Sequence, residues 1–352
     1  MLVFTKNIKS PFKVLFGEVT TRDLDHCVAV SSHGQVVTIR DLLHLKHNNQ
    51  LILKKLQGQN VALFYPDSFA LSLVLLLLDG VCHRLVILPP ERNSAELNQF
   101  ISMSGVDHIV SADDLAFETN IPSTFMSVDT GPTDILVSFS KPIDQTDSDV
   151  NTEWILATSG TTGIPKLVAH DLSSLTNNTK KTIKNSPFKW GLLYDLHRFA
   201  GLQVFFQALF GGSTLVFANQ LSDFSEKVGH LVRQDCNALS ATPTMWRKIL
   251  MLGNRDWLLT SITLGGEIAD NNILKALANH FPDANIRHIY ASTEAGVGFT
   301  VTDGKAGFPD SYLVTPANNV ELKIVDNILW VRSMCVAKGY LKDGKRPLDS
   351  AQ

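Results

Sequence analysis

The sequence predicts an α/β protein with two packed, largely parallel sheets, flanking helices and a small antiparallel β portion near the C-terminus. Short apolar runs alternate with helical segments through most of the 352 residues. Near the C-terminus this alternation gives way to strand-like patterns with a period of two. Hydrophobic residues make up 44% of the chain and charged residues 18%, which is typical of a globular protein with a large core.

The first repeat of the pattern is strand, helix, strand. Residues 61–64 are a short apolar run, and Pro66-Asp67-Ser68 is a helix-start signal before a leucine-rich stretch that ends at Leu78. Asp79-Gly80 predicts the end of that helix, and residues 85–88 form the next apolar run. A strand, helix and strand in this order indicate parallel strands joined by a right-handed crossover.

The alternation continues along the chain. Helices are predicted over 96–103, 222–234 and 271–280, and strands over 108–110, 154–157, 238–241, 262–264 and 286–289. Residues 320–325 and 327–332 alternate apolar and polar side chains and predict an antiparallel hairpin that turns at Asp326-Asn327. We interpret the acidic segment 144–152 as a surface loop, and we expect lobes at 1–185 and 186–305 and a β-rich portion at 306–352.

Composition excludes several classes of function. The net charge of −3 provides no positive surface for nucleic acid, so we expect no nucleic-acid partner. The four cysteines form no C-x-x-C pair, which disfavours a zinc site and a disulfide framework. The apolar segment 69–78 has about half the length needed to span a bilayer. With no signal-peptide pattern at the N-terminus, we expect a cytoplasmic protein without a membrane span.

A polar loop follows the apolar run 154–157. Residues 158–166 have the sequence Thr-Ser-Gly-Thr-Thr-Gly-Ile-Pro-Lys. Glycines allow backbone N–H groups to turn toward a polyphosphate, hydroxyls add donors, and Lys166 adds a positive charge. A Walker P-loop is excluded because Pro165 stands where a glycine is required and Leu167 where Ser or Thr is required. An ordinary turn remains the alternative.

Two further segments carry candidate binding groups. Residues 288–294 are predicted at the C-terminal end of a strand, where ligands bind in open α/β sheets. Tyr290 offers a flat ring for a base, Thr293 a hydroxyl for a phosphate, and Glu294 an oxygen ligand for Mg²⁺. Gly265-Gly266 follows another predicted strand and permits close approach of a ligand. For both segments the alternative is an ordinary turn.

These motifs resemble those of the adenylate-forming enzymes: acyl- and aryl-CoA ligases, luciferases and the adenylation domains of peptide synthetases. Residues 158–167 resemble the family pattern [YT]-[ST]-S-G-[ST]-T-G-x-P-K-G, except that Leu167 replaces the last glycine. Residues 288–294 resemble N-x-Y-G-x-T-E, with His288 and Ala291 as departures. The stretch from 328 to 340 resembles G-E-L-x-V-[KR]-G…G-Y. The similarity covers the chain from about residue 25 onward, with its motifs in the family order.

The resemblance implies ATP and Mg²⁺ as cofactors and a role for each motif. It assigns the phosphates to Thr158, Ser159, Gly160, Thr161, Thr162 and Gly163, with Lys166 as an auxiliary cation. It implies that the nucleotide, on the side next to the acid, is contacted by Gly265, Gly266, Glu267, Tyr290, Ala291 and Ser292. Thr293 would contact the α-phosphate and Glu294 would hold Mg²⁺.

The resemblance also suggests the class of substrate. Counting back from Gly212, His197 falls where acyl- and aryl-CoA ligases carry a pocket histidine, and Phe199 where amino-acid-activating domains carry an aspartate. A buried substrate ammonium without that carboxylate would cost several kcal/mol. His197, Phe199 and Leu202 therefore predict a small-molecule carboxylate without an α-amino group. A histidine that only caps a helix, or an amino-acid-activating domain, remains the alternative.

The family forms an acyl-adenylate and then transfers the acyl group to a thiol, either coenzyme A or the phosphopantetheine arm of a carrier protein. Its small C-terminal domain supplies a catalytic lysine, and nothing after Tyr340 resembles that domain. We therefore expect a large N-terminal domain only, truncated relative to the family and weakly active or inactive alone. A non-catalytic module that binds ATP or acyl-adenylate is the competing hypothesis.

Overall fold

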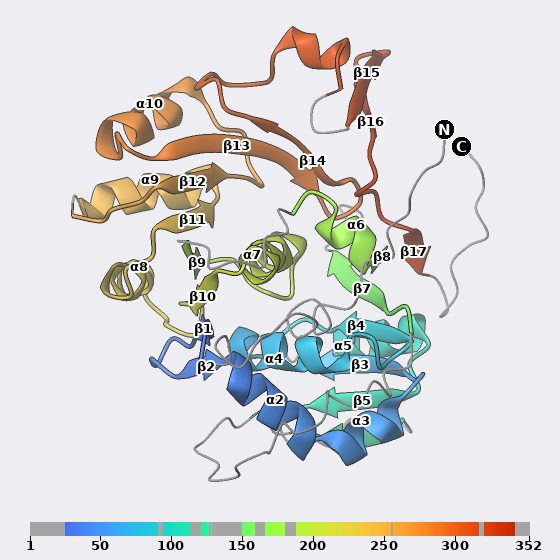
Figure 1. Ribbon diagram of the computed structural model, residues 1–352. Coiled ribbons are helices and arrows are strands. Elements are labelled where there is room, and N and C mark those ends of the chain that lie inside the picture. Colours follow the sequence, from blue (N-terminus) through green and yellow to red (C-terminus); the bar gives the residue numbers. More distant parts are fainter. Residues whose placement is uncertain are drawn as a thin grey trace. The chain divides into compact units, whose positions relative to one another are not determined.

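A computed structural model of the chain describes residues 25–90, 94–112, 121–126, 128, 150–158, 166–179, 188–254, 256–316 and 320–341 (Figure 1). The described residues form two compact units. The first unit draws on Met1–Cys27, Val37–Ser173 and Lys338–Gln352, and the second on Val28–Val36 and Ser174–Ala337. These units differ in their boundaries from the lobes expected at 1–185, 186–305 and 306–352, because strands far apart in the sequence pair within one sheet.

A seven-stranded sheet organises the first unit. Its order is β17-β8-β7-β4-β3-β5-β6. The strands are β3 (Asn60–Phe64), β4 (Arg84–Ile87), β5 (His108–Ser111), β6 (Ser123–Phe125), β7 (Glu153–Thr158), β8 (Lys166–Asp171) and β17 (Gly339–Leu341). Pairing is parallel from β6 to β7 and antiparallel at β7–β8 and β8–β17. Its helices are α2 (Ile39–Asn48), α3 (Gln50–Leu56), α4 (Ser68–Leu78) and α5 (Ser94–Ser104).

Helix α4 confirms the start and stop signals of the sequence. Asp67 is the N-cap, and its carboxylate accepts hydrogen bonds from the backbone N–H groups of Phe69 and Ala70. The helix ends at Leu78, and Gly80 adopts the left-handed conformation with φ of +82°. Nearly every residue of α4 is buried, which explains why its apolar residues surround the helix instead of forming one stripe.

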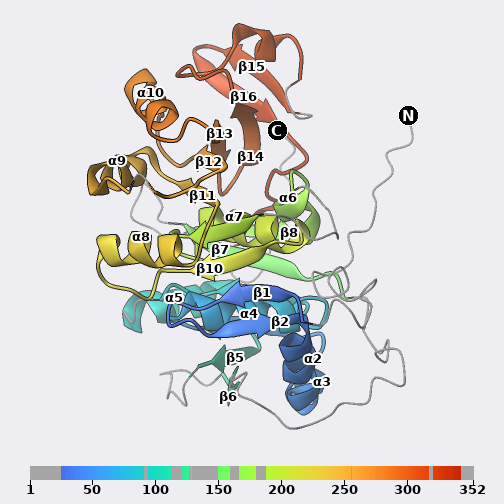
Figure 2. The same cartoon turned by 60° about the vertical axis from the view of Figure 1, so that its left-hand side comes forward.

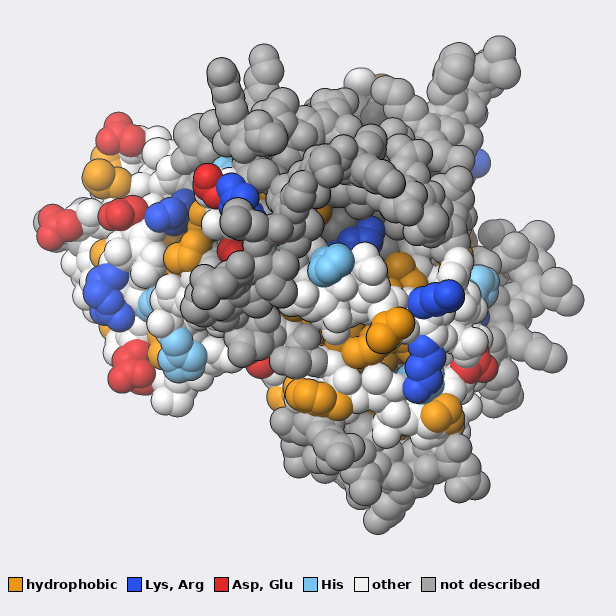
Figure 3. Space-filling model, turned by 60° about the horizontal axis from the view of Figure 1, so that its bottom comes forward, with side chains coloured by type: hydrophobic (Ala, Val, Ile, Leu, Met, Phe, Trp, Pro, Cys, Tyr) orange, Lys and Arg blue, Asp and Glu red, His pale blue; other side chains and the backbone are white. Residues whose placement is uncertain are grey.

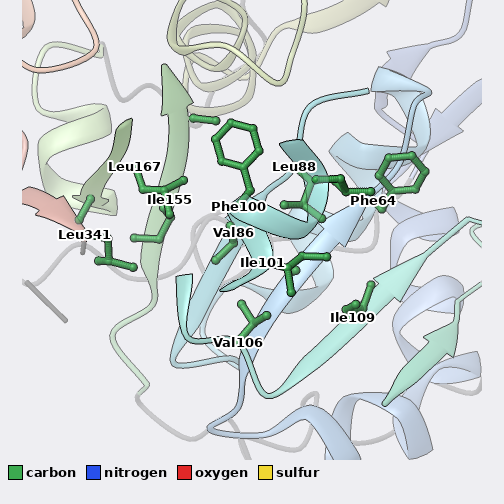
Figure 4. Packing of buried hydrophobic residues seen from close by; sticks show 14 residues of the cluster. Phe64, Val86, Leu88, Phe100, Ile101, Val106, Ile109, Ile155, Leu167 and Leu341 are labelled. Carbon is green, nitrogen blue, oxygen red and sulfur yellow. The ribbon is translucent and has the colours of Figure 1, made fainter. Parts of the chain in front are cut away.

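The core of this unit joins distant parts of the chain. Phe100 and Ile101 of α5 pack on strand residues such as Val86, while Leu167 of β8 and Leu341 of β17 belong to the same cluster (Figure 4). Leu341 is only 3% exposed. Strand β17, which the sequence did not predict, pairs with β8 and carries Leu341 into this core.

An eight-stranded sheet organises the second unit, with the order β14-β13-β12-β11-β9-β10-β1-β2. Its strands are β1 (Cys27–Val30), β2 (Val36–Thr38), β9 (Lys189–Leu192), β10 (Thr214–Phe217), β11 (Ala238–Ala241), β12 (Ser261–Leu264), β13 (Asn285–Ser292) and β14 (Gly296–Val301). Its helices are α6 (Leu172–Thr176, at the boundary), α7 (Phe199–Phe210), α8 (Phe224–Arg233), α9 (Pro243–Leu252) and α10 (Asn271–His280). Figures 1 and 2 show α8, α9 and α10 following one another beside the strands.

The predicted C-terminal hairpin is confirmed. Strands β15 (Glu321–Val325) and β16 (Ile328–Arg332) pair antiparallel and form a small separate sheet. Asp326 and Asn327 have φ of 51° and 60°, as a two-residue turn with two left-handed positions requires. Leu322 of this hairpin packs on Phe299 of β14, near a short 3₁₀ helix at Asp310–Leu313.

None of the helices in the described ranges is long and apolar enough to cross a membrane. On the face shown in Figure 3, acidic, basic and hydrophobic side chains are interspersed.

Candidate functional site

In the second unit, the predicted site residues follow adjacent parallel strands. Strands β9, β11, β12 and β13 are neighbours in the sheet and run parallel, so their carboxyl ends share one edge. The segments that leave this edge begin at Leu193, Thr242, Gly265 and Thr293. This is the edge at which open α/β sheets bind ligands. Three of the segments singled out in the sequence, which carry His197, Gly265-Gly266 and Thr293-Glu294, follow strands of this edge.

The segment after β9 holds His197 in a defined orientation. The Asp195 carboxylate accepts hydrogen bonds from the His197 backbone N–H at 3.0 Å and from ring Nδ1 at 2.5 Å. His197 is 3% exposed. A Cβ at Gly201 would lie 2.2 Å from the carbonyl oxygen of Asp195, so only glycine lets α7 pack this closely on the turn. Phe199 and Leu202 lie in α7 and are buried.

Asp195 is a site residue that sequence reasoning missed. Burial raises the pKa of its carboxyl, but the hydrogen bond and the charge of His197 outweigh burial and hold that pKa below its usual value. The carboxylate therefore stays ionised and fixes Nδ1 of the imidazole as a donor. The spacing Asp-x-His is the available signal, because an aspartate often accepts a hydrogen bond from the backbone two residues later.

The Gly265-Gly266 loop lies close to its neighbours. The Tyr194 hydroxyl donates to the Gly265 carbonyl oxygen at 3.4 Å, and burial raises the pKa of this tyrosine. A Cβ at Gly265 would lie 3.0 Å from Cγ1 of Ile289, and Gly266 has φ of +81°. The two glycines are therefore required by a left-handed turn and a close packing contact. This accounts for their place in the fold with or without a ligand.

Glu267 faces the start of helix α9. Its Oε2 accepts hydrogen bonds from the Thr244 hydroxyl at 2.6 Å and the Thr244 backbone N–H at 3.0 Å. The hydroxyl bond, with smaller contributions from the backbone N–H, Thr242 and Arg247, lowers the pKa of the Glu267 carboxyl. Glu267 therefore ties the loop after β12 to the first turn of α9, whose N-cap is Thr242.

Strand β13 is longer than predicted and carries the second motif partly inside the strand. Leu264, the last residue of β12, pairs with His288, and β13 continues to Ser292. The expectation that the motif follows the strand end is therefore wrong for Tyr290, Ala291 and Ser292, because pairing with β14 extends β13 through them. The register shifts between Tyr290 and Ala291. Thr293 and Glu294 lie in the turn that follows β13.

Tyr290 retains an accessible ring. It stacks on Phe299 of β14 with centroids 5.4 Å apart and planes inclined by 8°, and the residue is 42% exposed. His288, which replaces the family asparagine, donates from Nε2 to the carbonyl oxygen of Gly307 at 2.7 Å. The imidazole therefore anchors the loop around Gly307 beside β13.

Two returning segments support the turn that carries Glu294. The Glu294 carbonyl oxygen accepts from the Ala337 backbone N–H at 2.8 Å, and the Asn178 side chain donates to the Val297 carbonyl oxygen at 2.7 Å. Gly296 has φ of +69°, and a Cβ there would lie 2.2 Å from the carbonyl oxygen of Cys335. The position of Glu294 is thus set by Ala337 and Cys335, about forty positions later in the chain, and by Asn178, more than a hundred positions earlier. No local pattern in the sequence indicated them.

The first unit carries the ends of the predicted phosphate loop. Strands β7 and β8 form an antiparallel hairpin in which Thr158 pairs with Lys166. Ser159, Gly160, Thr161, Thr162 and Gly163 lie outside the described residues. The ammonium of Lys166 lies 5.3 Å from the ring centroid of Tyr340. The loop predicted from the sequence therefore connects two paired strands, and Tyr340 of β17 contacts the lysine at its end.

The residues present fit the two groups that the motifs imply. Among the described residues, no three His, Cys, Asp or Glu side chains could hold a metal ion together. Mg²⁺ does not require such a cluster, because it is commonly bound by one or two carboxylates with phosphate oxygens and water. Glu294 supplies one carboxylate at the ligand edge. For a nucleotide, the exposed part of the Tyr290 ring offers a stacking surface.

Comparisons with known proteins identify the family of the chain. A model of the family described as AMP-binding enzyme matches residues 26–341. The chain is 29% identical over 196 residues to a 2-succinylbenzoate–CoA ligase of Salmonella typhimurium, over 53% of this chain and 40% of that protein. It is 26% identical over 221 residues to a D-alanine–D-alanyl carrier protein ligase of Staphylococcus aureus, over 56% of this chain and 44% of that protein. The chain thus spans less than half the length of these curated relatives in the matched regions.

Solved structures show the same fold at low sequence identity. The N-terminal subdomain of NpsA from Klebsiella oxytoca, in complex with 3-hydroxybenzoyl-AMSN, matches with a TM-score of 0.74 and 16% identity, over 95% of this chain and 89% of that chain. The o-succinylbenzoate CoA synthetase MenE from Bacillus subtilis, in complex with its acyl-adenylate intermediate OSB-AMP, matches with a TM-score of 0.71 and 18% identity, over 95% and 71%. The predicted fold class is confirmed.

Proposed function

The chain belongs to the AMP-binding enzyme family, and from this premise we propose that it binds MgATP and a carboxylic acid and activates the acid as an acyl-adenylate. The observation that carries this proposal is the shared edge of β9, β11, β12 and β13. There Tyr194 contacts the Gly265-Gly266 loop and Ile289 lies beside Gly265, while His197 and the Thr293-Glu294 turn belong to the segments that follow β9 and β13. The curated relatives are named as ligases of 2-succinylbenzoate and of D-alanine, which supports the same reaction class.

The proposed reaction is R–COO⁻ + ATP → R–CO–AMP + pyrophosphate. A carboxylate oxygen forms a bond to the α-phosphorus, and the bond from that phosphorus to the bridging oxygen breaks. No proton needs to be removed, so the protein contributes mainly orientation and neutralisation of charge. In this scheme Glu294 holds Mg²⁺, which neutralises phosphate charge when bound, Thr293 donates to the α-phosphate and Tyr290 stacks on the base.

The first unit carries the residues that the resemblance assigns to the terminal phosphates. By resemblance we assign the β- and γ-phosphates to Thr158, Ser159, Gly160, Thr161, Thr162 and Gly163, with Lys166 as a nearby cation. By the same argument Gly265, Gly266, Glu267, Ala291 and Ser292 form the border of the nucleotide site. Glu267 would hold this loop in place, since its carboxylate accepts a hydrogen bond from the Thr244 hydroxyl.

We assign the acid to the side of the site formed by His197, Phe199 and Leu202. Phe199 and Leu202 are buried at the start of α7, and no carboxylate occupies the position of Phe199. An apolar or aromatic acid without an α-amino group suits these side chains, because a buried ammonium would lack an ionic partner. The acyl acceptor would be a thiol of coenzyme A or of a carrier protein, as the printed names of the relatives suggest.

A pyrophosphate exchange assay with a panel of aliphatic, aryl and amino acids tests the proposal. We expect acid-dependent exchange with apolar or aromatic acids. MgATP binding without exchange on any acid would instead support the non-catalytic binding module. Exchange restricted to α-amino acids would show that the assignment of the substrate class is wrong.

Replacement of Phe199 sharpens the assignment of the acid. Phe199→Asp places a carboxylate at the start of α7, and we expect about ten-fold weaker binding of an apolar acid in a thermal-shift titration. Phe199→Leu keeps the site apolar and serves as the control. If both variants bind the acid as the wild type does, Phe199 does not line the acid site.

A further inference from the structure

Lys166 shares one face of its sheet with a residue far away in the sequence. Lys166 and Val168 are two positions apart on β8, so their side chains point to the same side. Tyr340 pairs directly with Val168 across the antiparallel β8–β17 ladder, and opposite residues in such a ladder share a face. Thr158 pairs with Lys166 across β7–β8 and joins this face. Thr158, Lys166 and Tyr340 therefore lie on one side of the hairpin.

The other side of the same strands is core. Leu167, Ala169, Ala157 and Leu341 alternate with these residues and belong to the buried cluster of the first unit (Figure 4). A one-residue slip of β17 would expose Leu341 and bury Tyr340, so burial of Leu341 fixes the register. The position of Tyr340 beside Lys166 is therefore a consequence of core packing.

Tyr340 makes a specific contact with the lysine. The Lys166 ammonium is 5.3 Å from the centre of the Tyr340 ring, within the range of a cation–π interaction. Both residues are partly open to solvent, with Tyr340 42% exposed. Lys338 anchors the start of β17, because its backbone N–H donates to the Ala169 carbonyl oxygen at 2.7 Å and its ammonium pairs with Asp171 at 3.0 Å. Asp171 thus has its own cationic partner, and the Lys166 ammonium has the ring of Tyr340.

We infer that Tyr340 is a positioning residue for Lys166: its ring restricts the lysine to the face shared with Thr158, where the ammonium meets the phosphates of the nucleotide. This inference rests on the proposed function, and it adds a role for β17 that the phosphate loop alone does not suggest. A long lysine side chain loses considerable rotamer entropy when it binds a phosphate. A ring that already limits those rotamers lowers that entropic cost.

The experiment compares Tyr340→Phe with Tyr340→Leu. Phenylalanine keeps the aromatic face, whereas leucine keeps an apolar strand residue without it. Calorimetric titrations with MgATP, and separately with inorganic pyrophosphate, give the affinities. We expect Tyr340→Phe to match the wild type and Tyr340→Leu to bind both ligands about two- to five-fold more weakly, the equivalent of one exposed cation–π contact.

A double-mutant cycle tests whether Tyr340 acts through Lys166. In a Lys166→Met background, Tyr340→Leu should cause no further loss of affinity. Phe125→Leu is the matched control, because Phe125 is an exposed aromatic residue on β6, at the opposite edge of the same sheet. Circular dichroism and urea unfolding show whether each variant is folded.

The outcomes separate the inference from the proposed function. Absence of MgATP and pyrophosphate binding by the wild-type chain would reject the proposed function and the inference together. Wild-type binding with unchanged affinity in Tyr340→Leu would reject only the inference. Tighter binding by Tyr340→Leu would also overturn it, since the ring would then hold Lys166 away from the phosphates. Equal losses in Tyr340→Leu with and without Lys166 would show that Tyr340 acts by another route.

Discussion

The hairpins β7–β8 and β13–β14 carry the two strongest motifs, and they are supported in different ways. Each adds an antiparallel strand to a sheet that is otherwise mainly parallel. Strand β7 is almost completely buried, whereas most residues of β13 are only half-buried. The first hairpin therefore rests on the apolar core. In the second hairpin, β14 packs in a smaller apolar cluster, and the turn that carries Glu294 is held by hydrogen bonds and close backbone contacts.

One short C-terminal segment nevertheless supports both hairpins. The Ala337 backbone N–H donates to the Glu294 carbonyl oxygen in the second unit, and the next residue, Lys338, donates to Ala169 in the first unit. The boundary between the units falls between these two residues. A short sequence motif can therefore depend on contacts with a distant part of the chain. In the first unit these contacts include core packing, and in the second unit they are hydrogen bonds and close backbone contacts.

The largest expected effect concerns the buried hydrogen bond between Trp154 of β7 and Asp79, and its contribution to stability at different pH values. The Trp154 indole N–H donates to the Asp79 carboxylate at 2.7 Å, and burial raises the pKa of Asp79 to about 7 although this bond opposes the shift. In the unfolded chain an aspartate has a pKa of about 3.9. Between the two pKa values, Asp79 is therefore protonated in the folded state and ionised in the unfolded state. This stabilisation is fully present below about pH 4 and is lost as the pH rises through about 7.

We expect the contribution of Asp79 to the free energy of unfolding to fall by about 3 kcal/mol between pH 5 and pH 8. Asp79→Asn keeps an acceptor for Trp154 and removes the titration. Urea unfolding followed by tryptophan fluorescence should show a flatter pH profile for the variant and greater stability than the wild type at pH 8. Parallel profiles for the two proteins would show that Asp79 is ionised throughout this range.

The second prediction concerns the close backbone contact of the other hairpin. Gly296→Ala places a Cβ against the Cys335 backbone, whereas the Cβ of Gly304→Ala would have no neighbouring heavy atom within 4 Å. Both glycines have similar positive φ. Gly304→Ala should therefore cost only the backbone strain of about 1 kcal/mol, and Gly296→Ala about 2 kcal/mol more. Thermal unfolding measures both costs. Equal destabilisation would mean that Cys335 does not support the turn.

A smaller effect is expected from Asn178, whose side chain donates to the Val297 carbonyl oxygen. Asn178→Ala should cost about 1 kcal/mol and raise the Mg²⁺ concentration that half-saturates ATP binding by a few-fold. The exposed Asn272 on α10 provides a control, since Asn272→Ala should change neither quantity. A loss of stability with an unchanged Mg²⁺ requirement would limit Asn178 to a structural role.

The sequence predicted the elements whose signals are local. Asp67 and Gly80 mark the ends of α4, and Asp326-Asn327 form the turn of the C-terminal hairpin. Strands β8 and β17 were not predicted, because Lys166 and Tyr340 had been assigned only to motifs and their pairing joins residues far apart. The end of β13 was misplaced for the same reason. Pairing partners decide where a strand ends, and single-sequence patterns do not contain them.

The candidate site divides in the same way. Residue types indicated Tyr290 and Glu294, since their chemistry suits a nucleotide and a metal, and the resemblance to the family indicated His197. The residues that orient them, such as Asp195 and Cys335, are ordinary in the sequence and became apparent only from their contacts. A motif can therefore identify groups that bind, while the fold identifies the groups that hold them in place.

The most direct test of the account is a calorimetric titration of ATP into the wild-type chain and into Glu294→Gln, each with and without Mg²⁺. Glutamine preserves the size of the side chain and removes its charge. We expect Mg²⁺ to strengthen ATP binding to the wild type and to have little effect on the variant, since we propose the Glu294 carboxylate as the protein's ligand for the metal. Equal Mg²⁺ dependence in the two proteins, or no ATP binding by the wild type, would contradict the assignment of the nucleotide site.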